Sequence, residues 1–385
     1  MILIIFLGAL VLLYLLAIAF LYRGFARLAR QARSASQPKI SVVVCAHNEE
    51  KNLPNCLRHL SQQSYPQKLV EFIIVNDRST DRTQEIIDQF KKKDVRFRSI
   101  TIRDRLPDFA PKKRAIDAAI RQANGEIILL TDADGRPGPH WIATMASYFT
   151  PETHMVLGYA PYTIRPANHF VKKLLALEYL SHAAVAAAST GLNMPLTCVG
   201  TNMAYRKQLY LEIGGFGEYK AHLSGDDDLF LTRVREAKKY TIKYATDAEA
   251  QVFNNPPQLW SKFLHQRMRY ASKGFDYPLK VTLGLVSYYL MNALLVGLTF
   301  FFVLVPPFPL ALLGIWGIKI FAEFLFMDKA ASVLHDRRTL QVFPVAALVH
   351  PLYVVVFGAI GPFKRFRWAE SHVEAAVQKP AMSKE

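Results

Sequence analysis

The sequence predicts an α/β domain, with a parallel or mixed sheet and flanking helices, joined to transmembrane α-helices. From Ile40 onward, short apolar runs alternate with helical segments, a pattern typical of a parallel sheet with helices on both faces. Two stretches, 1–22 and 281–318, contain no charged residue, and a helix that crosses a bilayer core needs about 20 apolar residues. Hydrophobic residues make up 51% of the 385-residue chain, which is high for a purely soluble protein.

Segment 1–22 is expected to be a retained transmembrane anchor. A cleaved signal peptide usually begins with a positive region and ends in small residues, whereas here the basic residues follow the apolar run, at Arg23, Arg27, Arg30, Arg33 and Lys39. By the positive-inside rule, this basic linker, 23–39, lies in the cytoplasm. We therefore expect an integral protein of the plasma (inner) membrane whose main domain is cytoplasmic.

The net charge and the cysteine content limit the classes of binding partner and of metal or disulfide site that the protein can have. A net charge of +16 fits either a nucleic-acid partner or anionic lipid head groups, and the second is favoured because basic residues flank the apolar segments. We expect no nucleic-acid partner. The three cysteines lack metal-site spacing, which fits a reducing cytoplasm and argues against a disulfide framework or zinc site: Cys45, Cys56 and Cys198.

The main domain, 40–280, begins with regular alternation. Strands are expected at 40–45, 72–75, 97–102 and 126–131, and helices at 51–62, 81–92 and 113–123. An Ala-rich helix at 171–189, interrupted by Glu178 and His182, is expected to stay in this domain. Ligands of such sheets bind beyond the carboxyl ends of the strands, so polar clusters that follow strands are candidate sites.

The C-terminal membrane region, 281–363, is expected to contain two or three spans. Prolines at 306, 307 and 309 separate the first two. Segment 341–361 either crosses the bilayer or dips in and returns. Four crossings would put both termini outside, whereas basic residues in the tail 364–385 favour the inside, so the sequence leaves the topology open.

Polar clusters follow three of the expected strands. Carboxylates in 45–50 and 76–81 could accept hydrogen bonds from a base or ribose, although ordinary capped turns would have similar sequences, and Asp81 is expected to be a cap. Asp132 and Asp134 follow the fourth strand. Two carboxylates at this place can share a divalent cation with a diphosphate, and their hard oxygen atoms suit Mg²⁺ or Mn²⁺. A solvated acidic turn is the alternative.

Two later clusters could also carry chemistry. One of the adjacent carboxylates 226–228 could act as a general base, although acids at a solvated helix start give the same pattern. Arg269, beside Gln266 and Tyr270, could bind phosphate oxygens while the tyrosine ring stacks on a sugar. A juxtamembrane basic helix would look similar.

Together, in this order, the five clusters resemble family 2 of the inverting glycosyltransferases over about 40–270, which implies a GT-A-like fold. In that family, acids after the first two strands hold the nucleotide, and these match Glu49 and Asp77. A motif lysine is similar to Lys112, with proline where the family has glycine. The Asp-x-Asp pair matches Asp132 and Asp134: both are implied as metal ligands, Asp134 more directly, and Asp132 also holds the donor.

The resemblance also implies catalytic and acceptor-side residues. The family's Glu-Asp pair, whose aspartate is the base, aligns with Gly225 and Asp226, with Asp227 as the rival base. The Gln-x-x-Arg-Trp motif aligns with Gln266, Arg269 and Tyr270, so the tyrosine would face the acceptor. A segment containing Gly200 and Asn202 is similar to the family's acceptor side, although a turn that packs a strand is an equal alternative.

The resemblance implies transfer of a sugar from a nucleotide diphosphate donor, a UDP-sugar, with Mg²⁺ or Mn²⁺. The acceptor is either a lipid or lipid-linked glycan that receives one sugar, or a polysaccharide that is extended and exported. Three candidate spans after the domain are few for a channel, which favours single transfer and leaves room for a membrane partner subunit. An inactive membrane scaffold is the non-enzymatic alternative.

Overall fold

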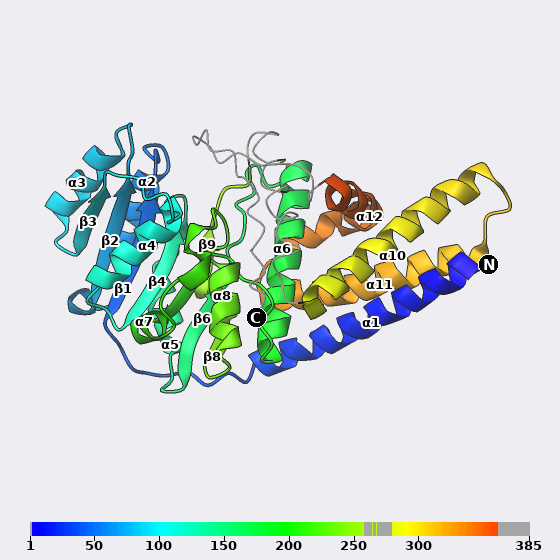
Figure 1. Ribbon diagram of the computed structural model, residues 1–385, viewed down its shortest axis with the longest axis horizontal. Helices are drawn as coiled ribbons and strands as arrows, with labels where there is room; N and C mark the ends of the chain where they lie inside the picture. The colour runs from blue at the N-terminus through cyan, green and yellow to red at the C-terminus, as the bar shows by residue number, and fades with distance from the viewer. Residues whose placement is uncertain (1, 258–263, 265–266, 268–278, 361–385) are drawn as a thin grey trace, which may run out of the picture. The chain divides into compact units, whose positions relative to one another are not determined.

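The computed structural model describes residues 2–257, 264, 267 and 279–360 (Figure 1). It divides into two compact units. The larger unit contains 17–256 together with 323–343, and the smaller contains the remaining described residues. Residues 40–256 of the predicted main domain lie in the larger unit.

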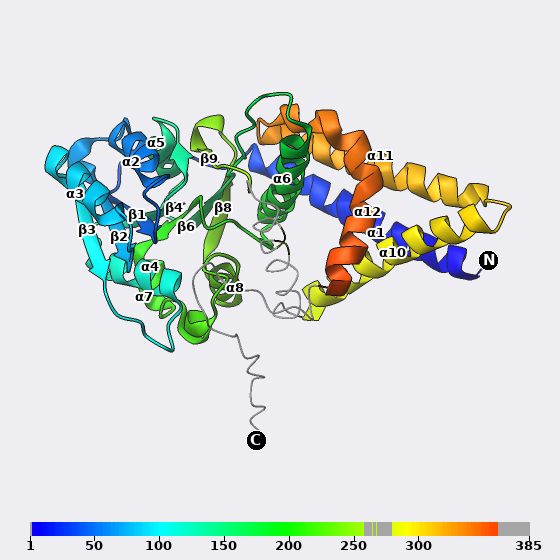
Figure 2. The ribbon, with the colours of Figure 1, turned by 90° about the horizontal axis from the view of Figure 1, so that it is seen from above.

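A seven-stranded mixed sheet forms the centre of the larger unit (Figures 1 and 2). Its strand order is β3-β2-β1-β4-β7-β6-β8. The first four run parallel, as predicted, whereas β7 is antiparallel to both of its neighbours. The bounds are β1 Ile40–Ala46, β2 Val70–Asp77, β3 Phe97–Ile102, β4 Ile127–Asp132, β6 Thr153–Gly158, β7 Met203–Arg206 and β8 Thr241–Ala245. A separate antiparallel pair consists of β5 Arg136–Pro137, which comes shortly after β4 in the chain, and β9 Val252–Phe253.

Helices cover both faces of the sheet, which confirms the predicted α/β class. They are α2 Leu53–Ser61, α3 Thr83–Lys93, α4 Pro111–Gln122, α5 Trp141–Ser147, α6 Phe170–Gly191, α7 Lys207–Glu212 and α8 Asp228–Glu236. Helix α4 begins at Pro111, a position where the missing N–H costs no intrahelical hydrogen bond. Short 3₁₀ helices are η1 Gln67–Leu69, η2 Gly217–Ala221, η3 Ala248–Ala250 and η5 Arg337–Val342.

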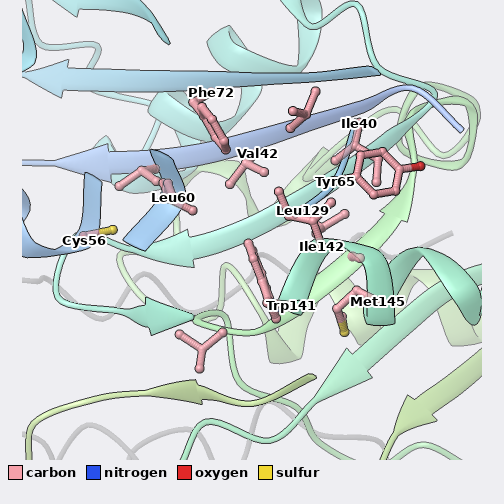
Figure 3. Close-up of a cluster of buried hydrophobic side chains, with 14 of the residues drawn as sticks. Ile40, Val42, Cys56, Leu60, Tyr65, Phe72, Leu129, Trp141, Ile142 and Met145 are labelled. Atoms are coloured by element: carbon pink, nitrogen blue, oxygen red, sulfur yellow. The ribbon is translucent and has the colours of Figure 1, made fainter. Parts of the chain in front are cut away.

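One apolar core fixes the parallel strands against α2 and α5 (Figure 3). Val42 and Leu129 point from the sheet toward Leu60 and Trp141, and all four are fully buried. Burying side chains of this size stabilises the fold by roughly 1.5–3 kcal/mol each. Because alternate residues of β1 and β4 are held in this way, the carboxyl ends of both strands are fixed at one edge of the sheet.

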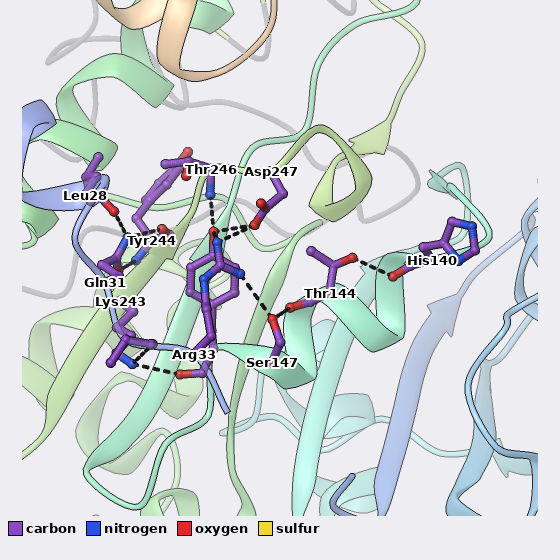
Figure 4. Close-up of polar contacts among 12 residues, drawn as sticks. Leu28, Gln31, Arg33, His140, Thr144, Ser147, Lys243, Tyr244, Thr246 and Asp247 are labelled. Carbon is purple, nitrogen blue, oxygen red and sulfur yellow. Dashed lines mark hydrogen bonds and ion pairs between the residues drawn. The ribbon is translucent and has the colours of Figure 1, made fainter. Parts of the chain in front are cut away.

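The basic linker is attached to the larger unit along β8 (Figure 4). The side chain of Gln31 donates to the carbonyl of Tyr244 (2.9 Å) and accepts from its N–H (3.2 Å). Arg33 pairs with Asp247 (2.6 Å) and donates to the hydroxyl of Tyr148 (2.7 Å). The linker therefore covers the edge strand, and the charge of Arg33, which the sequence assigned to lipid head groups, is paired within the domain.

Parts of two membrane-region helices also belong to the larger unit. Gly24, in α1 Ile2–Leu28, lies against the backbone of Ala188 in α6, where any side chain would collide with the carbonyl oxygen. After α11 Leu310–Val333, Asp336 accepts a hydrogen bond from Tyr159 (2.8 Å). Arg338 donates to the carbonyl of Tyr162 (3.0 Å). The end of α1 and the connection after α11 are thus packed onto the same unit as the sheet.

Among the described residues, four helices are long and apolar enough to cross a membrane: α1, α10 Leu279–Leu304, α11, and α12 Phe343–Ile360 with the preceding 3₁₀ turn. In the smaller unit, Leu7 and Val11 pack with Met291 and Leu295. Helix α12 continues through Pro351. The described part of segment 341–361 is therefore helical throughout. The basic tail, 364–385, lies outside the described residues.

Candidate functional site

The register of the sheet brings the three strand-end clusters together. Ala46 is level with Asn76, and Cys45 is level with Asp132, at the carboxyl ends of three adjacent parallel strands. Polar side chains that follow these strands therefore converge on one edge of the sheet, as expected.

The turns after β1 and β2 are bonded to each other. Asn48 accepts from the N–H of Thr80 (2.8 Å), and the N–H of Glu49 donates to the hydroxyl of Thr83 (2.9 Å). Asp81 accepts from the N–H of Thr83 (3.0 Å), the first residue of α3. The N-cap position itself is Arg82, whose side chain makes no cap hydrogen bond, so Asp81 bonds the helix start from one residue before the N-cap. This mutual bonding fixes Glu49 and Asp77 at the edge of the sheet.

Asp77 is bonded by its neighbour Arg78, which the sequence analysis did not single out. The guanidinium makes two hydrogen bonds to the carboxylate, at 2.7 and 2.9 Å, and this contact raises the pKa of Arg78. Arg78 has a left-handed backbone (φ 56°), which folds its side chain back onto Asp77. A nucleobase that binds Asp77 must share its carboxylate with Arg78 or displace the guanidinium.

Lys112, from the first turn of α4, joins two of the predicted carboxylates. Its Nζ lies 2.8 Å from Asp132 Oδ1 and 2.8 Å from Asp226 Oδ2. Burial would lower the pKa of Lys112, but the two carboxylates raise it well above its ordinary value, so the side chain is an ammonium. The hydroxyl of Thr201 donates to the other oxygen of Asp132. The four side chains form a connected polar centre beside a small pocket whose walls include Cys45 and Gly200.

Asp134 adds a further acid to this centre. Burial, followed by the charges of Asp132 and Glu49, raises the pKa of Asp134 to about 6. Carboxylates that disfavour each other's ionisation are stabilised by a shared cation, and their oxygen atoms suit Mg²⁺ or Mn²⁺. Within the described residues, no three acidic, histidine or cysteine side chains already stand together in a metal-holding group.

The carboxylates 226–228 have different partners, which explains how three adjacent acids are accommodated. Asp226 faces Lys112. Asp227 accepts from its neighbour's N–H (2.7 Å) and from the N–H of Gly200 (3.1 Å). Asp228 accepts from the hydroxyl of Thr197 (2.9 Å) and from a backbone N–H (3.1 Å). Asp226 is thus the member of the three directed at the polar centre, whereas Asp227 and Asp228 bind the start of α8 to the segment 197–200.

Gly200 and Asn202 have different places. A Cβ at Gly200 would lie 3.1 Å from Asp226 Oδ2, so the chain passes close to this carboxylate. Asn202 is fully buried. Its amide donates to the carbonyls of Tyr159 and Ala250 (2.7 and 2.8 Å) and accepts from the Trp141 indole (3.0 Å). The expectation that Asn202 faces an acceptor is corrected, because its polar atoms are bonded inside the core.

The remaining predicted residues, Gln266, Arg269 and Tyr270, lie outside the described part of the chain. Their assignment stays a prediction.

Comparison with known proteins agrees with this geometry. Residues 41–214, which include β1, β2, β4 and most of the polar centre, match the family model of glycosyl transferase family 2. Residues 41–214 are thus a family 2 glycosyltransferase domain. Among curated relatives, it is 28% identical to the probable glycosyltransferase YdaM of Bacillus subtilis, over 61% of this chain and 54% of that protein. It is 26% identical to an N-acetylglucosaminyltransferase of Rhizobium meliloti, over 62% and 56%.

A third relative is a beta-monoglucosyldiacylglycerol synthase of Synechocystis, 25% identical over 64% of this chain and 50% of that protein. The chain thus spans about half the length of these curated relatives. Among solved structures, a mannosyltransferase of Pyrobaculum calidifontis in complex with GDP-Man and Mn²⁺ has a TM-score of 0.54 at 17% identity, covering 94% of this chain and 98% of that one. This likeness confirms the GT-A-like fold.

Proposed function

We propose that the protein is a membrane glycosyltransferase that transfers a sugar from a nucleotide diphosphate donor, with inversion, to an acceptor at the cytoplasmic membrane face. The observation that carries the proposal is the placement of Lys112 between Asp132 and Asp226, at the carboxyl edge of a family 2 sheet. In this arrangement the ammonium of Lys112 contacts both Asp132, which we assign to the donor, and Asp226, which we assign to the acceptor.

The donor is held by acids at the ends of three strands. Glu49 and Asp77 hold the nucleoside, and Asp132 with Lys112 lies beside the sugar diphosphate. Asp134, helped by Asp132, holds Mg²⁺ or Mn²⁺, which would neutralise charge on the departing diphosphate. The raised pKa of Asp134 supports this assignment, as does the Mn²⁺ of the Pyrobaculum calidifontis mannosyltransferase complex. A UDP-sugar is the proposed donor.

Asp226 is the proposed general base. Its carboxylate accepts the proton of the acceptor hydroxyl as that oxygen attacks the anomeric carbon on the face opposite the leaving group, which inverts the configuration. The ammonium of Lys112, 2.8 Å from the carboxylate, orients it. Asp227 is less suited to the role because its two oxygens accept backbone hydrogen bonds. Gln266 and Arg269 would close over the diphosphate, with Tyr270 near the acceptor.

We propose a lipid or lipid-linked glycan acceptor that receives one sugar. The four apolar helices support a membrane position, and one relative is named for the synthesis of a glycolipid. The end of α1 and the connection after α11 pack on the sheet's unit, so both belong on the domain's side of the membrane, where the basic linker favours the cytoplasm. A ladder of long products would instead favour the processive polysaccharide synthase, with or without a partner subunit.

The test is metal-dependent transfer from a panel of nucleotide sugars by the detergent-purified protein. Asp134→Ala should abolish turnover, and Asp226→Asn should lower kcat by at least about 100-fold. Asp88→Asn, at a half-buried position on α3, is the matched control and should be fully active. Near-normal turnover of Asp226→Asn would show that the base assignment is wrong. If the protein binds no nucleotide sugar either with or without the metal, the inactive scaffold is favoured.

A further inference from the structure

Lys113, the neighbour of Lys112 on α4, is a buried cation to which the proposed chemistry gives no part. Its side chain is only 1% exposed. The ammonium Nζ donates to the carbonyl oxygens of Tyr219 (2.6 Å) and Ser224 (3.0 Å). A buried ammonium is costly unless its hydrogens are bonded, so these contacts constrain the loop that contains both carbonyls.

This loop leads directly to Asp226. Ser224 precedes the proposed base by two residues, and between them Gly225 has a left-handed backbone (φ 81°). A Cβ at that position would lie 2.5 Å from Leu229 Cγ. The turn therefore requires glycine, and the direction of the chain into Asp226 depends on where the Ser224 carbonyl is held.

The start of α4 holds the loop at several points. The N–H of Ala110, the N-cap residue of α4, donates to the carbonyl of Lys220 (2.8 Å). Lys113 bonds the backbone on both sides of that point, and Lys112 bonds the carboxylate of Asp226 itself. Two adjacent lysines thus contact the same loop in different ways, one through its backbone and one through the reacting group.

We infer that Lys113 is a positioning residue that fixes the backbone before Asp226, and so holds its carboxylate at the acceptor side of the polar centre. The inference rests on the proposed function of Asp226. The contacts that carry the inference are those of the Lys113 ammonium with the loop backbone. Its effect should therefore fall on the rate of the chemical step, because displacement of a reacting group by about 1 Å can cost on the order of 100-fold in rate.

The experiment compares Lys113→Met with Lys207→Met in the full-length protein. Lys207 is half-buried and also donates to a backbone carbonyl, that of Ala123 (2.7 Å), but it lies at the opposite edge of the sheet, beside the start of β4. Both variants lose a lysine–carbonyl contact. We expect Lys113→Met to lower kcat by about 10- to 100-fold with less than about twofold change in the donor KM, and Lys207→Met to keep the wild-type kcat.

A double mutant gives a readout that a general loss of stability would not change. If Lys113 acts through Asp226, adding Lys113→Met to Asp226→Asn should leave the residual rate unchanged. A further fall as large as in the wild-type background would overturn the inference, as would a normal kcat in Lys113→Met. Should Lys113→Met not fold, Lys113→Gln retains one donor and the same cycle applies. Normal turnover of Asp226→Asn would instead overturn the assignment of Asp226 as the base in the proposed function.

Discussion

Binding of Mn²⁺ to the metal-free protein should weaken about tenfold when the pH falls from 7 to 5. The perturbation acts on Asp134, whose pKa is raised from 3.8 to about 6 by burial and by the charges of Asp132 and Glu49. Below about pH 6 this carboxyl carries a proton that the cation must displace, because metal ligands bind in their deprotonated form.

The magnitude follows from competition between the proton and the metal. With a pKa of about 6, the apparent Kd is multiplied by about 1.1 at pH 7 and by about 11 at pH 5. An aspartate with the ordinary pKa of 3.8 would give a factor of only about 1.1 at pH 5. Because the folded protein holds this proton more tightly than the unfolded chain, the metal-free protein loses stability as the pH rises from about 4 to 6, and saturating Mn²⁺ should reverse that loss.

The assay is a titration of detergent-purified protein with Mn²⁺ alone, with free Mn²⁺ measured by electron paramagnetic resonance at several pH values. Asp134→Asn is the control: it should bind Mn²⁺ weakly at every pH and lack most of the pH dependence. Equal Kd values at pH 5 and pH 7 for the wild-type protein would refute the assignment of Asp134 as a metal ligand with a raised pKa.

Three further outcomes are expected. Lys112→Met should lower kcat/KM by on the order of 100-fold, because Asp132 and Asp226 then face each other without the shared cation; wild-type initial rates would contradict this. Asn202→Ala should lower the free energy of unfolding by about 3 kcal/mol, because three buried hydrogen bonds are lost. A lower melting temperature with an unchanged donor KM would agree with this structural role, and an unchanged melting temperature would contradict it. Gly225→Ala should reduce both melting temperature and kcat, because φ is 81° and the methyl group would meet a leucine side chain; a stable, fully active variant would show that this turn can relax.

The sequence alone determined the local elements and the position of each cluster along the chain. Strand β3 has the predicted bounds, and the other early elements differ by a few residues, because apolar periodicity reports local burial directly. The Asp-x-Asp pair was placed correctly at the end of β4. The long apolar segments likewise predicted helices able to cross a membrane.

The sequence pattern could not distinguish the roles of neighbouring residues that have different surroundings in the fold. Lys112 and Lys113 are adjacent on one helix, yet one joins two carboxylates and the other holds a loop about a hundred residues away along the chain. Gly200 approaches Asp226, whereas Asn202 is buried in the core. The sequence shows the type of each side chain, but not the face on which it lies.

Only the tertiary structure decided which distant segments meet. Strand β7 pairs antiparallel between β4 and β6, and the linker residue Arg33 pairs with Asp247. Each contact joins segments separated by many residues, so neither periodicity nor local propensity specifies it. Such contacts form because burying apolar surface and pairing polar groups favour one arrangement of the whole chain, and that arrangement brings Lys112, Asp132 and Asp226 together.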